Sequence, residues 1–319
     1  MGLDSATVAY LERSGALAAP RAHEIGPRLA RAAMTARQLS DPPGPVMTHH
    51  DSVITGADGS RIALRWLQPP ALDTSSDPAV LVFYHGGGWV LGEIAGFDGT
   101  ARRLAAATGC EVVMVEYRLA PEHPYPAAVG DAWHALLAVR DSRPQQRIVV
   151  VGDSAGGNLA AVMALRAKAA GVDLACQVLI YPVVDTDFDR ASYRCPQNQL
   201  LLDAATMRWF WDQYVPDETR RRHPDASPLR AADHRGLAPA IVVTADNDVL
   251  ADEGEAYVTA LRTAGVRVTH RRFEGQMHGF IGMPRLPGSA AAFAFIGDSL
   301  AAILVDPAAD GTTEQEQRS

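Results

Sequence analysis

The chain has 319 residues, of which 47% are hydrophobic and 21% charged. This composition excludes a disordered or low-complexity protein and allows one main domain with a sizeable core. The net charge of −8 argues against nucleic acid as a partner, because phosphate backbones are bound by surfaces rich in lysine and arginine.

The three cysteines, Cys110, Cys176 and Cys195, are too few and too scattered for a disulfide framework or a zinc site. Cys110 and Cys176 each open an apolar run, which predicts a buried position. Residues 1–15 lack the basic and then apolar pattern of a secretory signal, and no apolar run reaches the roughly 20 residues needed to span a bilayer. We therefore expect a cytoplasmic protein with no membrane partner.

The first part of the chain predicts a helical arm followed by a hairpin. Residues 3–38 carry apolar side chains at helical spacing, and the prolines within residues 40–45 end this pattern. Residues 1–45 are therefore expected to form an N-terminal helical arm. Residues 52–67 contain two alternating runs around the turn sequence GADGS, which predicts a β-hairpin.

Six short, fully apolar runs follow, separated by helical stretches. Runs that are apolar on both faces are typical of a parallel sheet with helices on both sides. Together with the hairpin they predict an α/β fold with about eight strands. The runs begin at Ala79, Glu111, Arg147, Cys176, Ala240 and Arg267.

This alternation of strands and helices fails once, at residues 186–235, which predicts a helical insertion. We expect the insertion and the arm to form a cap above the strand ends, where open α/β sheets bind their ligands. The core is then divided into residues 46–185 and 236–305. The polar tail, residues 306–319, is predicted to be disordered.

A polar pair, Asp153 and Ser154, stands where an apolar strand changes into a small-residue helical segment. A strand that turns at once into a helix holds its middle turn residue in a cramped backbone geometry, and Gly152 and Gly156 leave room for that turn. The turn exposes the Ser154 hydroxyl, and the N–H of Ala155 opens the helix beside it. The spacing G-x-S-x-G therefore predicts a nucleophile, against the alternative of a plain turn serine.

The stretch FYHGGGWVLG ends the strand that begins at Ala79, at the same edge of the sheet. An oxygen that becomes negatively charged during nucleophilic attack needs N–H donors on backbone free of side chains. Gly86, Gly87 and Gly88 meet this requirement and predict an oxyanion hole. The alternative, an ordinary glycine-rich turn, leaves His85 and three successive glycines unexplained.

The base of an elbow-type triad is a histidine late in the chain, because the order is serine, acid, histidine. His223 falls in the insertion, His234 in a polar loop and His270 inside a strand. His278 follows the last strand by a short loop, which predicts a position at the sheet edge and the role of the base.

The acid is expected in the loop after the preceding strand, where Asp246, Asp248, Asp252 and Glu253 stand. Asp252 and Glu253 fit as first-turn acids of the next helix. Asp246 and Asp248 both remain candidates on this reasoning. Asp153 is expected to brace a loop, because its side chain points away from the adjacent serine.

The ordered stretches HGGGW, EYRLAPEHPYPA, GDSAGGN, DNDVLADE and MHGF make the chain similar to the hormone-sensitive-lipase branch of the α/β-hydrolase esterases. The similarity runs from about His49 to the last helix. It implies an α/β-hydrolase fold with a helical cap, Ser154 as nucleophile, Asp248 as acid and His278 as base. It also implies an oxyanion hole in which Gly87, Gly88 and Ala155 donate N–H groups while Gly86 and His85 shape the loop.

This resemblance implies a serine carboxylesterase that hydrolyses short-chain acyl esters through an acyl-enzyme, with no metal and no organic cofactor. The expected partner is a small-molecule acyl ester, and the oligomeric state stays open, a homo-oligomer included. Two alternatives remain. The substrate is a related lactone, amide or acetylated metabolite, or the protein is a non-catalytic small-molecule binder of the same fold, although retention of all three triad residues weighs against the second.

The sequence MRWFWDQYV places Met207, Trp211 and Tyr214 on one helical face, with Phe210 beside them. Together with Trp89, which follows the three glycines, these residues are expected to contact the substrate as a bulky lid face that shortens the pocket. The alternative is that they only pack the insertion onto the N-terminal arm, since an aromatic stripe at helical spacing often belongs to a core.

Overall fold

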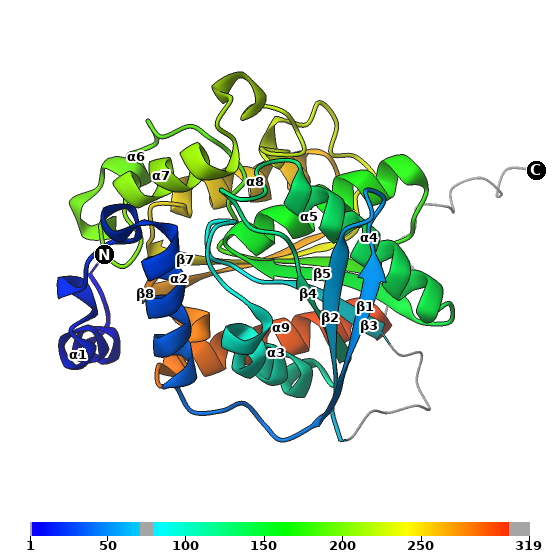
Figure 1. The fold of residues 1–319 in the computed structure, drawn as a ribbon, viewed down its shortest axis with the longest axis horizontal. Coiled ribbons are helices and arrows are strands. Elements are labelled where there is room, and N and C mark those ends of the chain that lie inside the picture. Colours follow the sequence, from blue (N-terminus) through cyan, green and yellow to red (C-terminus); the bar gives the residue numbers. More distant parts are fainter. Residues whose placement is uncertain (1, 71–78, 306–319) are drawn as a thin grey trace, which may run out of the picture.

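The computed structural model describes residues 2–70 and 79–305, and the predicted disordered tail lies outside them. One eight-stranded sheet crosses the molecule in the order β1-β2-β4-β3-β5-β6-β7-β8 (Figure 1). β2 runs antiparallel to both of its neighbours, and β3 to β8 are parallel to one another. The predicted α/β fold with about eight strands is confirmed. The strands are β1 Thr48–Thr55, β2 Arg61–Gln68, β3 Ala79–Tyr84, β4 Glu111–Glu116, β5 Arg147–Asp153, β6 Cys176–Ile180, β7 Ala240–Asn247 and β8 Val268–Met277.

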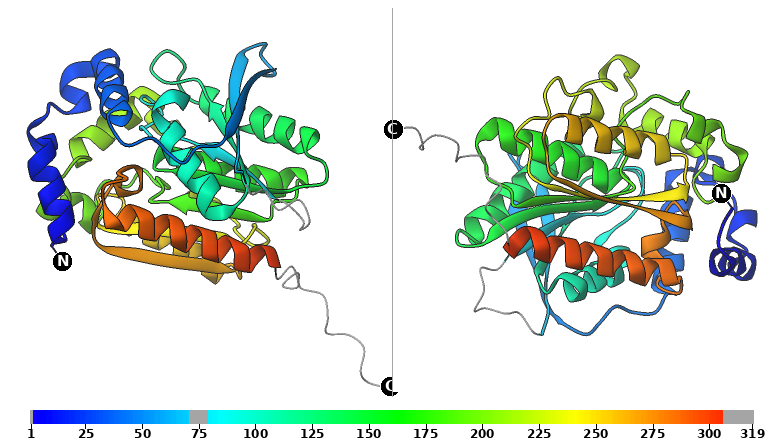
Figure 2. Two further views of the ribbon diagram at one scale, coloured as in Figure 1. Left: turned by 90° about the horizontal axis from the view of Figure 1, so that it is seen from below. Right: turned by 180° about the vertical axis from the view of Figure 1, so that it is seen from behind.

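The central strands are buried on both faces because their side chains alternate between two apolar cores. In β3, Val80 and Val82 point into one core, and Leu81 and Phe83 point into the other. Helices α4, α5 and α8 cover the first face, and α3 and α9 cover the second (Figure 2). These helices are α3 Ile94–Thr108, α4 Ala127–Ser142, α5 Ala155–Ala170, α8 Ala251–Thr263 and α9 Pro287–Val305.

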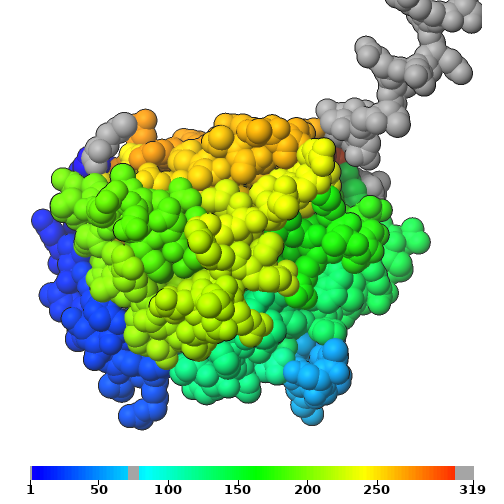
Figure 3. All heavy atoms as spheres, turned by 90° about the horizontal axis from the view of Figure 1, so that it is seen from above, coloured from blue at the N-terminus to red at the C-terminus, as the bar shows by residue number. Residues whose placement is uncertain are grey.

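The N-terminal arm contains α1 (Ser5–Ser14), a 3₁₀ turn and α2 (Ala22–Leu39), which lies beside the segment of residues 186–235 (Figure 3). Contact between the two is polar as well as apolar. His23 Nδ1 and Thr206 Oγ1 are hydrogen-bonded at 2.9 Å. The Nε of Arg21 lies 3.6 Å from an oxygen of Asp203. Asp203 and Thr206 both lie at the start of α7, so these contacts hold the beginning of α2 against the beginning of α7.

The segment of residues 186–235 is less helical than its sequence pattern suggested. Its α-helices are α6 (Ala191–Arg194) and α7 (Ala204–Tyr214), and the remainder is loops and 3₁₀ turns. Four prolines, Pro196, Pro216, Pro224 and Pro228, interrupt it. Because proline lacks an N–H and clashes with the preceding turn, long helices cannot form between them.

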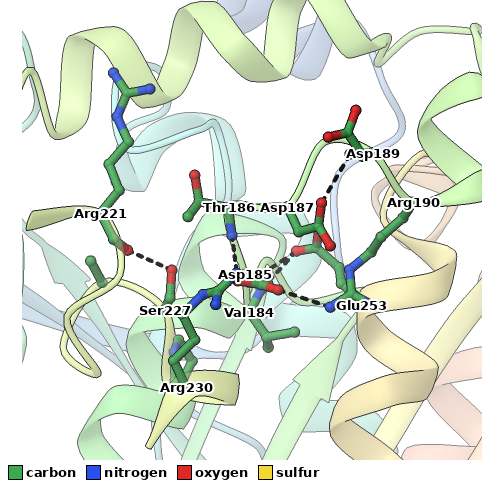
Figure 4. A network of polar contacts seen from close by, with 12 residues as sticks. Val184, Asp185, Thr186, Asp187, Asp189, Arg190, Arg221, Ser227, Arg230 and Glu253 are labelled. Atoms are coloured by element: carbon green, nitrogen blue, oxygen red, sulfur yellow. Dashed lines mark hydrogen bonds and ion pairs between the residues drawn. The ribbon is translucent and has the colours of Figure 1, made fainter. Parts of the chain in front are cut away.

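A buried ionic network fastens the same segment to the end of β6 (Figure 4). Asp185 accepts hydrogen bonds from Arg190 at 2.8 Å and from Arg230 at 2.6 Å. Glu253, in the first turn of α8, accepts the N–H of Val184 at 2.8 Å. Burial, with a contribution from Asp185, raises the pKa of Glu253 to about 8. The predicted first-turn acid therefore also connects α8 to the chain that leaves β6.

Among the described residues, helix α9 is long and apolar enough by length and composition to cross a membrane, whereas no apolar run of that length was predicted from the sequence. In the structure its buried side packs against α3 and the sheet. At Gly297 the two helices come so close that an added Cβ would collide with the carbonyl oxygen of Ala107.

Gly297→Ala is therefore expected to destabilise the fold by about 1–3 kcal/mol, because the methyl group must push α9 away from α3. Gly130→Ala in α4 is the matched control, since nothing lies within 4 Å of its added Cβ. The control should be neutral or stabilised by up to about 1 kcal/mol through helix propensity. Urea unfolding of both variants measures the difference. A Gly297→Ala protein as stable as the control would show that the helices are not in close contact.

Candidate active site

Ser154 occupies the one-residue turn between β5 and α5, with φ 55° and ψ −117°. A non-glycine residue at positive φ is strained by about 1–3 kcal/mol and persists only where its surroundings hold it. Here the surroundings are backbone in close contact. A Cβ on Gly152 would collide with the carbonyl oxygen of Gly156, and a Cβ on Gly156 would collide with that of Tyr84 in β3. The two glycines are thus required for space, and they present Ser154 at the carboxyl edge of the sheet.

Ser154, His278 and Asp248 form a continuous hydrogen-bonded chain. Ser154 Oγ lies 3.0 Å from His278 Nε2, and His278 Nδ1 lies 2.7 Å from Asp248 Oδ2. A carboxylate only accepts hydrogen bonds at neutral pH, so Nδ1 carries the proton and Nε2 is free to accept one from the serine. The Asp248 side chain is only 1% exposed and that of His278 13%, which shields their interaction from water.

Asp248 and His278 are held in place by the elements before and after them. Asp248 Oδ1 accepts the N–H of Leu250 at 2.9 Å, and Asn198 donates to the Asp248 carbonyl oxygen at 3.0 Å. β8 extends to Met277, so His278 follows the strand directly and not by the short loop expected from sequence. The Tyr181 ring packs against the imidazole with centroids 4.7 Å apart.

The other acids of this loop are engaged elsewhere. Asp246 accepts hydrogen bonds from Arg272 Nε and from the N–H of Gly275. Asp252 accepts the N–H of Ser192 at 2.8 Å. Of the two candidates left open by spacing alone, Asp248 is the one in contact with His278, which agrees with the pattern carried by the resemblance.

The glycine loop after β3 adopts backbone conformations that other residues rarely take. Gly87 has φ 112° and Gly88 has φ 61°. An added Cβ would collide with the backbone of Leu91 at Gly87 and with the ring of Phe210 at Gly88. Within residues 2–70 and 79–305, the N–H groups of Gly87, Gly88 and Ala155 have no protein acceptor. They are available to a developing negative charge beside Ser154.

Gly86 holds this loop in position. Its N–H donates to Asp153 Oδ1 at 2.8 Å, so it is not a donor for the oxyanion. His85 Nδ1 donates to the Gly86 carbonyl oxygen at 2.8 Å, and the Tyr117 hydroxyl donates to the His85 carbonyl at 2.7 Å. His85 is stacked on Tyr117 with centroids 4.4 Å apart. Asp153 therefore braces a specific loop, the glycine loop Gly86–Gly88, which we also call the oxyanion loop.

His85 and Asp153 form a bracing layer beneath the oxyanion loop, and burial shifts the pKa of both side chains. It lowers the pKa of His85 to about 4, which keeps the imidazole neutral at physiological pH. It raises the pKa of Asp153 to about 7, against smaller opposing effects of the Gly86 N–H and His278. The oxyanion loop therefore rests on a carboxyl group that titrates near neutrality.

A cavity of about 760 Å³ opens above Ser154 and His278. Its walls come from α1, α2, the glycine loop, α7 and the loop before α9, and Phe210 is the residue of the predicted lid face that lines it. A cavity of this size holds drug-sized ligands. The space is therefore larger than the shortened pocket expected from the sequence.

Trp89, Met207, Trp211 and Tyr214 do not line this cavity, which corrects their expected role as substrate contacts. All four are buried, and Trp89 stacks on Tyr214 with centroids 4.2 Å apart and meets Trp211 at 5.1 Å. The rings of Trp211 and Tyr214 in α7 therefore pack against Trp89, which directly follows the glycine loop. Phe210, one position round the helix, is left to face the cavity.

Within the described residues, no group of three or more histidine, cysteine, aspartate or glutamate side chains is placed to bind a metal ion. Cys110 and Cys176 are buried, as expected from their apolar runs.

A family model described as alpha/beta hydrolase fold matches residues 81–282. A carboxylic ester hydrolase of Mycobacterium tuberculosis is 40% identical over 225 residues, 67% of this chain and 60% of that protein. A carboxylesterase of the same species is 37% identical over 278 residues, 83% of this chain and 86% of the relative. An ethyl acetate hydrolase of Pseudomonas putida is 37% identical over 241 residues, 73% of this chain and 76% of the relative.

The crystal structure of a thermostable esterase from Pseudomonas putida superposes with a TM-score of 0.87 at 36% identity. The superposition covers 95% of this chain and 98% of the esterase. At this coverage the similarity includes the arm and the segment of residues 186–235 as well as the sheet.

Asp153→Asn tests the titration beneath the oxyanion loop. Between the usual aspartate pKa and about 7, the unfolded chain has lost the Asp153 proton and the folded chain has kept it, so stability falls as pH rises. Asparagine keeps an oxygen for the Gly86 N–H but does not titrate. The free energy of unfolding of the variant, relative to wild type, should therefore increase from pH 5 to pH 8 in denaturant titrations. Parallel curves for the two proteins would show that Asp153 is ionised throughout.

Proposed function

The chain belongs to the α/β-hydrolase fold family, and we propose that it is a serine carboxylesterase that hydrolyses short-chain acyl esters. The observation that carries this proposal is the hydrogen-bonded chain from Ser154 through His278 to Asp248, beside three backbone N–H groups that have no acceptor in the described part of the chain. The similarity to carboxylesterases and to an ethyl acetate hydrolase supports it.

In the acylation step, Ser154 Oγ attacks the ester carbonyl while its proton passes to His278 Nε2. Asp248 accepts a hydrogen bond from Nδ1–H of His278. This bond maintains the imidazole tautomer with a free Nε2 and stabilises the imidazolium that forms. The carbonyl oxygen becomes negatively charged, and the N–H groups of Gly87, Gly88 and Ala155 stabilise it in a site shielded from water. Collapse of the tetrahedral intermediate transfers the Nε2 proton to the leaving alcohol.

In the deacylation step, a water molecule replaces the alcohol. His278 Nε2 removes its proton, and the hydroxide attacks the acyl-serine carbonyl. The same three N–H groups stabilise the second oxyanion. The acid leaves and Ser154 regains its proton, so the cycle consumes one water and needs no metal or organic cofactor.

The arm (residues 1–45) and the insertion (186–235) are proposed to act together as the cap of this site. The bond between His23 and Thr206 and the proximity of Arg21 to Asp203 support that view. A cytoplasmic location and the absence of nucleic acid and membrane partners stay proposals from composition. A lactone, amide or acetylated metabolite would use the same catalytic groups.

Ser154→Ala should abolish hydrolysis of 4-nitrophenyl acetate and leave the fold intact, because it removes one hydroxyl at a turn. The expected loss in turnover is of the order of 10⁴-fold or more, since triad residues act as a unit. Release of nitrophenolate measures it, with unfolding curves as the control for structure. Activity near that of wild type would contradict the proposal, and absence of activity in the wild type on esters, lactones and amides alike would favour a binding protein.

Asp248→Asn and Asp246→Asn separate the two acids of the loop. Asparagine at position 248 favours the wrong imidazole tautomer and should lower turnover by about 10⁴-fold. At position 246 it weakens the interaction with Arg272 and should lower turnover far less. Steady-state kinetics on the same ester ranks them, and greater damage from the Asp246 variant would overturn the assignment.

Activity across a series of 4-nitrophenyl esters should be highest at roughly two to six acyl carbons. Each added methylene contributes about 0.8 kcal/mol of binding until the acyl group meets the wall beside the glycine loop, where Phe210 contacts Gly88. Values of kcat/KM along the series test this, and Phe210→Ala should move the maximum to longer chains. A maximum at a long acyl chain in the wild type would contradict the short-chain preference.

A further inference from the structure

The cavity above Ser154 differs in chemistry between its depth and its mouth. At depth it is bounded by Ser154, His278, the glycine loop and buried apolar side chains such as Phe210 and Ile281. At the mouth it is lined by arginines of the N-terminal arm and of the loop before α9. Arg13, Arg37 and Arg285 are exposed, which places them at the solvent end.

Positive charge exceeds negative charge at this mouth. The residues that line the cavity include four arginines, the fourth being Arg21, and two carboxylates, Asp41 and Asp153. Asp153 belongs to the bracing layer beneath the glycine loop, so Asp41 is the carboxylate of the mouth. The whole chain has the opposite balance, with 29 Lys and Arg against 37 Asp and Glu. The charge balance at this cavity is therefore opposite in sign to that of the whole chain.

These arginines are only partly neutralised. Arg21 Nε lies 3.6 Å from Asp203 Oδ2, and Arg285 Nε lies 3.8 Å from Asp41 Oδ1. Both distances are longer than a hydrogen bond. Within the described ranges, the side chains of Arg13 and Arg37 make no ion pair with a carboxylate.

Arg37 and Arg285 both lower the pKa of Asp41 and that of Tyr10. Burial raises the pKa of Asp41, and Arg285 and Arg37 oppose that rise. The pKa of Tyr10 is raised by burial and by Asp41, and again lowered by these two arginines. Four residues from α1, α2, the chain after α2 and the loop before α9 thus form one cluster, the mouth cluster: Tyr10, Arg37, Asp41 and Arg285.

We infer, on the basis of the proposed esterase function, that the natural substrate is an ester carrying an anionic group remote from its ester bond, which the mouth cluster binds. Guanidinium groups present paired N–H donors that fit carboxylate or phosphate oxygens. The cavity volume of about 760 Å³ leaves room for such a group beyond a short acyl ester. A positive mouth on an acidic protein also attracts anions from solution.

Three acetate esters of matched size test the inference: 4-acetoxybenzoate, 4-acetoxyphenyl phosphate and the neutral methyl 4-acetoxybenzoate. The wild type should have a higher kcat/KM for an anionic ester than for the neutral one, mainly through a lower KM, and the preference should shrink at high ionic strength. The carboxylate and phosphate arms identify which anion is preferred. A second pair, a 4-nitrophenyl glutarate monoester and its methyl ester, tests an anion on the acyl side.

Arg37→Gln and Arg285→Gln should each lower the anionic-to-neutral ratio of kcat/KM by roughly fivefold, the size of one exposed ion pair. Arg222→Gln is the control, because Arg222 is exposed on the segment of residues 186–235 and does not line the cavity. A wild-type ratio of one or less in both sets of esters would overturn the inference, as would a ratio that these variants leave unchanged or that the control lowers equally. Hydrolysis of the neutral esters in those cases would leave the proposed esterase function standing.

Discussion

The site depends on one steric constraint, the close approach of backbone at the turn between β5 and α5. The carbonyl oxygens of Gly156 and Tyr84 occupy the places where side chains at Gly152 and Gly156 would lie. This packing holds Ser154 at a positive φ and at the same time brings the start of α5 against β3. The nucleophile, the N–H of Ala155 and the glycine loop after β3 are consequently brought together by the close packing of the first turn of α5 against β5 and β3.

The electrostatics of the site are organised around that turn in two layers. Below it, Asp153 holds the oxyanion loop through Gly86, and burial raises the pKa of its carboxyl group to about 7. Above it, Asp248 remains fully buried while contacting a histidine, which favours a positive charge on the imidazole during the reaction. The two carboxyl groups thus have different functions, because Asp153 contacts the backbone of the glycine loop and Asp248 contacts the imidazole of His278.

The sequence predicted those residues whose role depends on their immediate neighbours in the chain. The spacing around Ser154, the three glycines and the run of apolar strands follow from short-range geometry, and in the structure the Ser154 turn and the glycine loop lie beside the same cavity. It did not predict Asn198 and Tyr181, which contact the Asp248 loop and His278, because these contacts join segments far apart in the chain. The stripe that includes Trp211 was misassigned because helical spacing shows that a face is buried but not what lies against it.

The central claim is that Ser154 is the nucleophile and that its hydroxyl is activated within this geometry. An aryl phosphonate ester forms a stable tetrahedral adduct with an activated serine, and the mass of the intact protein reports the reaction. We expect one adduct per chain, with loss of the aryloxide leaving group, located by peptide mapping on the tryptic peptide that contains Ser154. A protein that hydrolyses esters but forms no adduct, or carries it on another residue, would contradict the account.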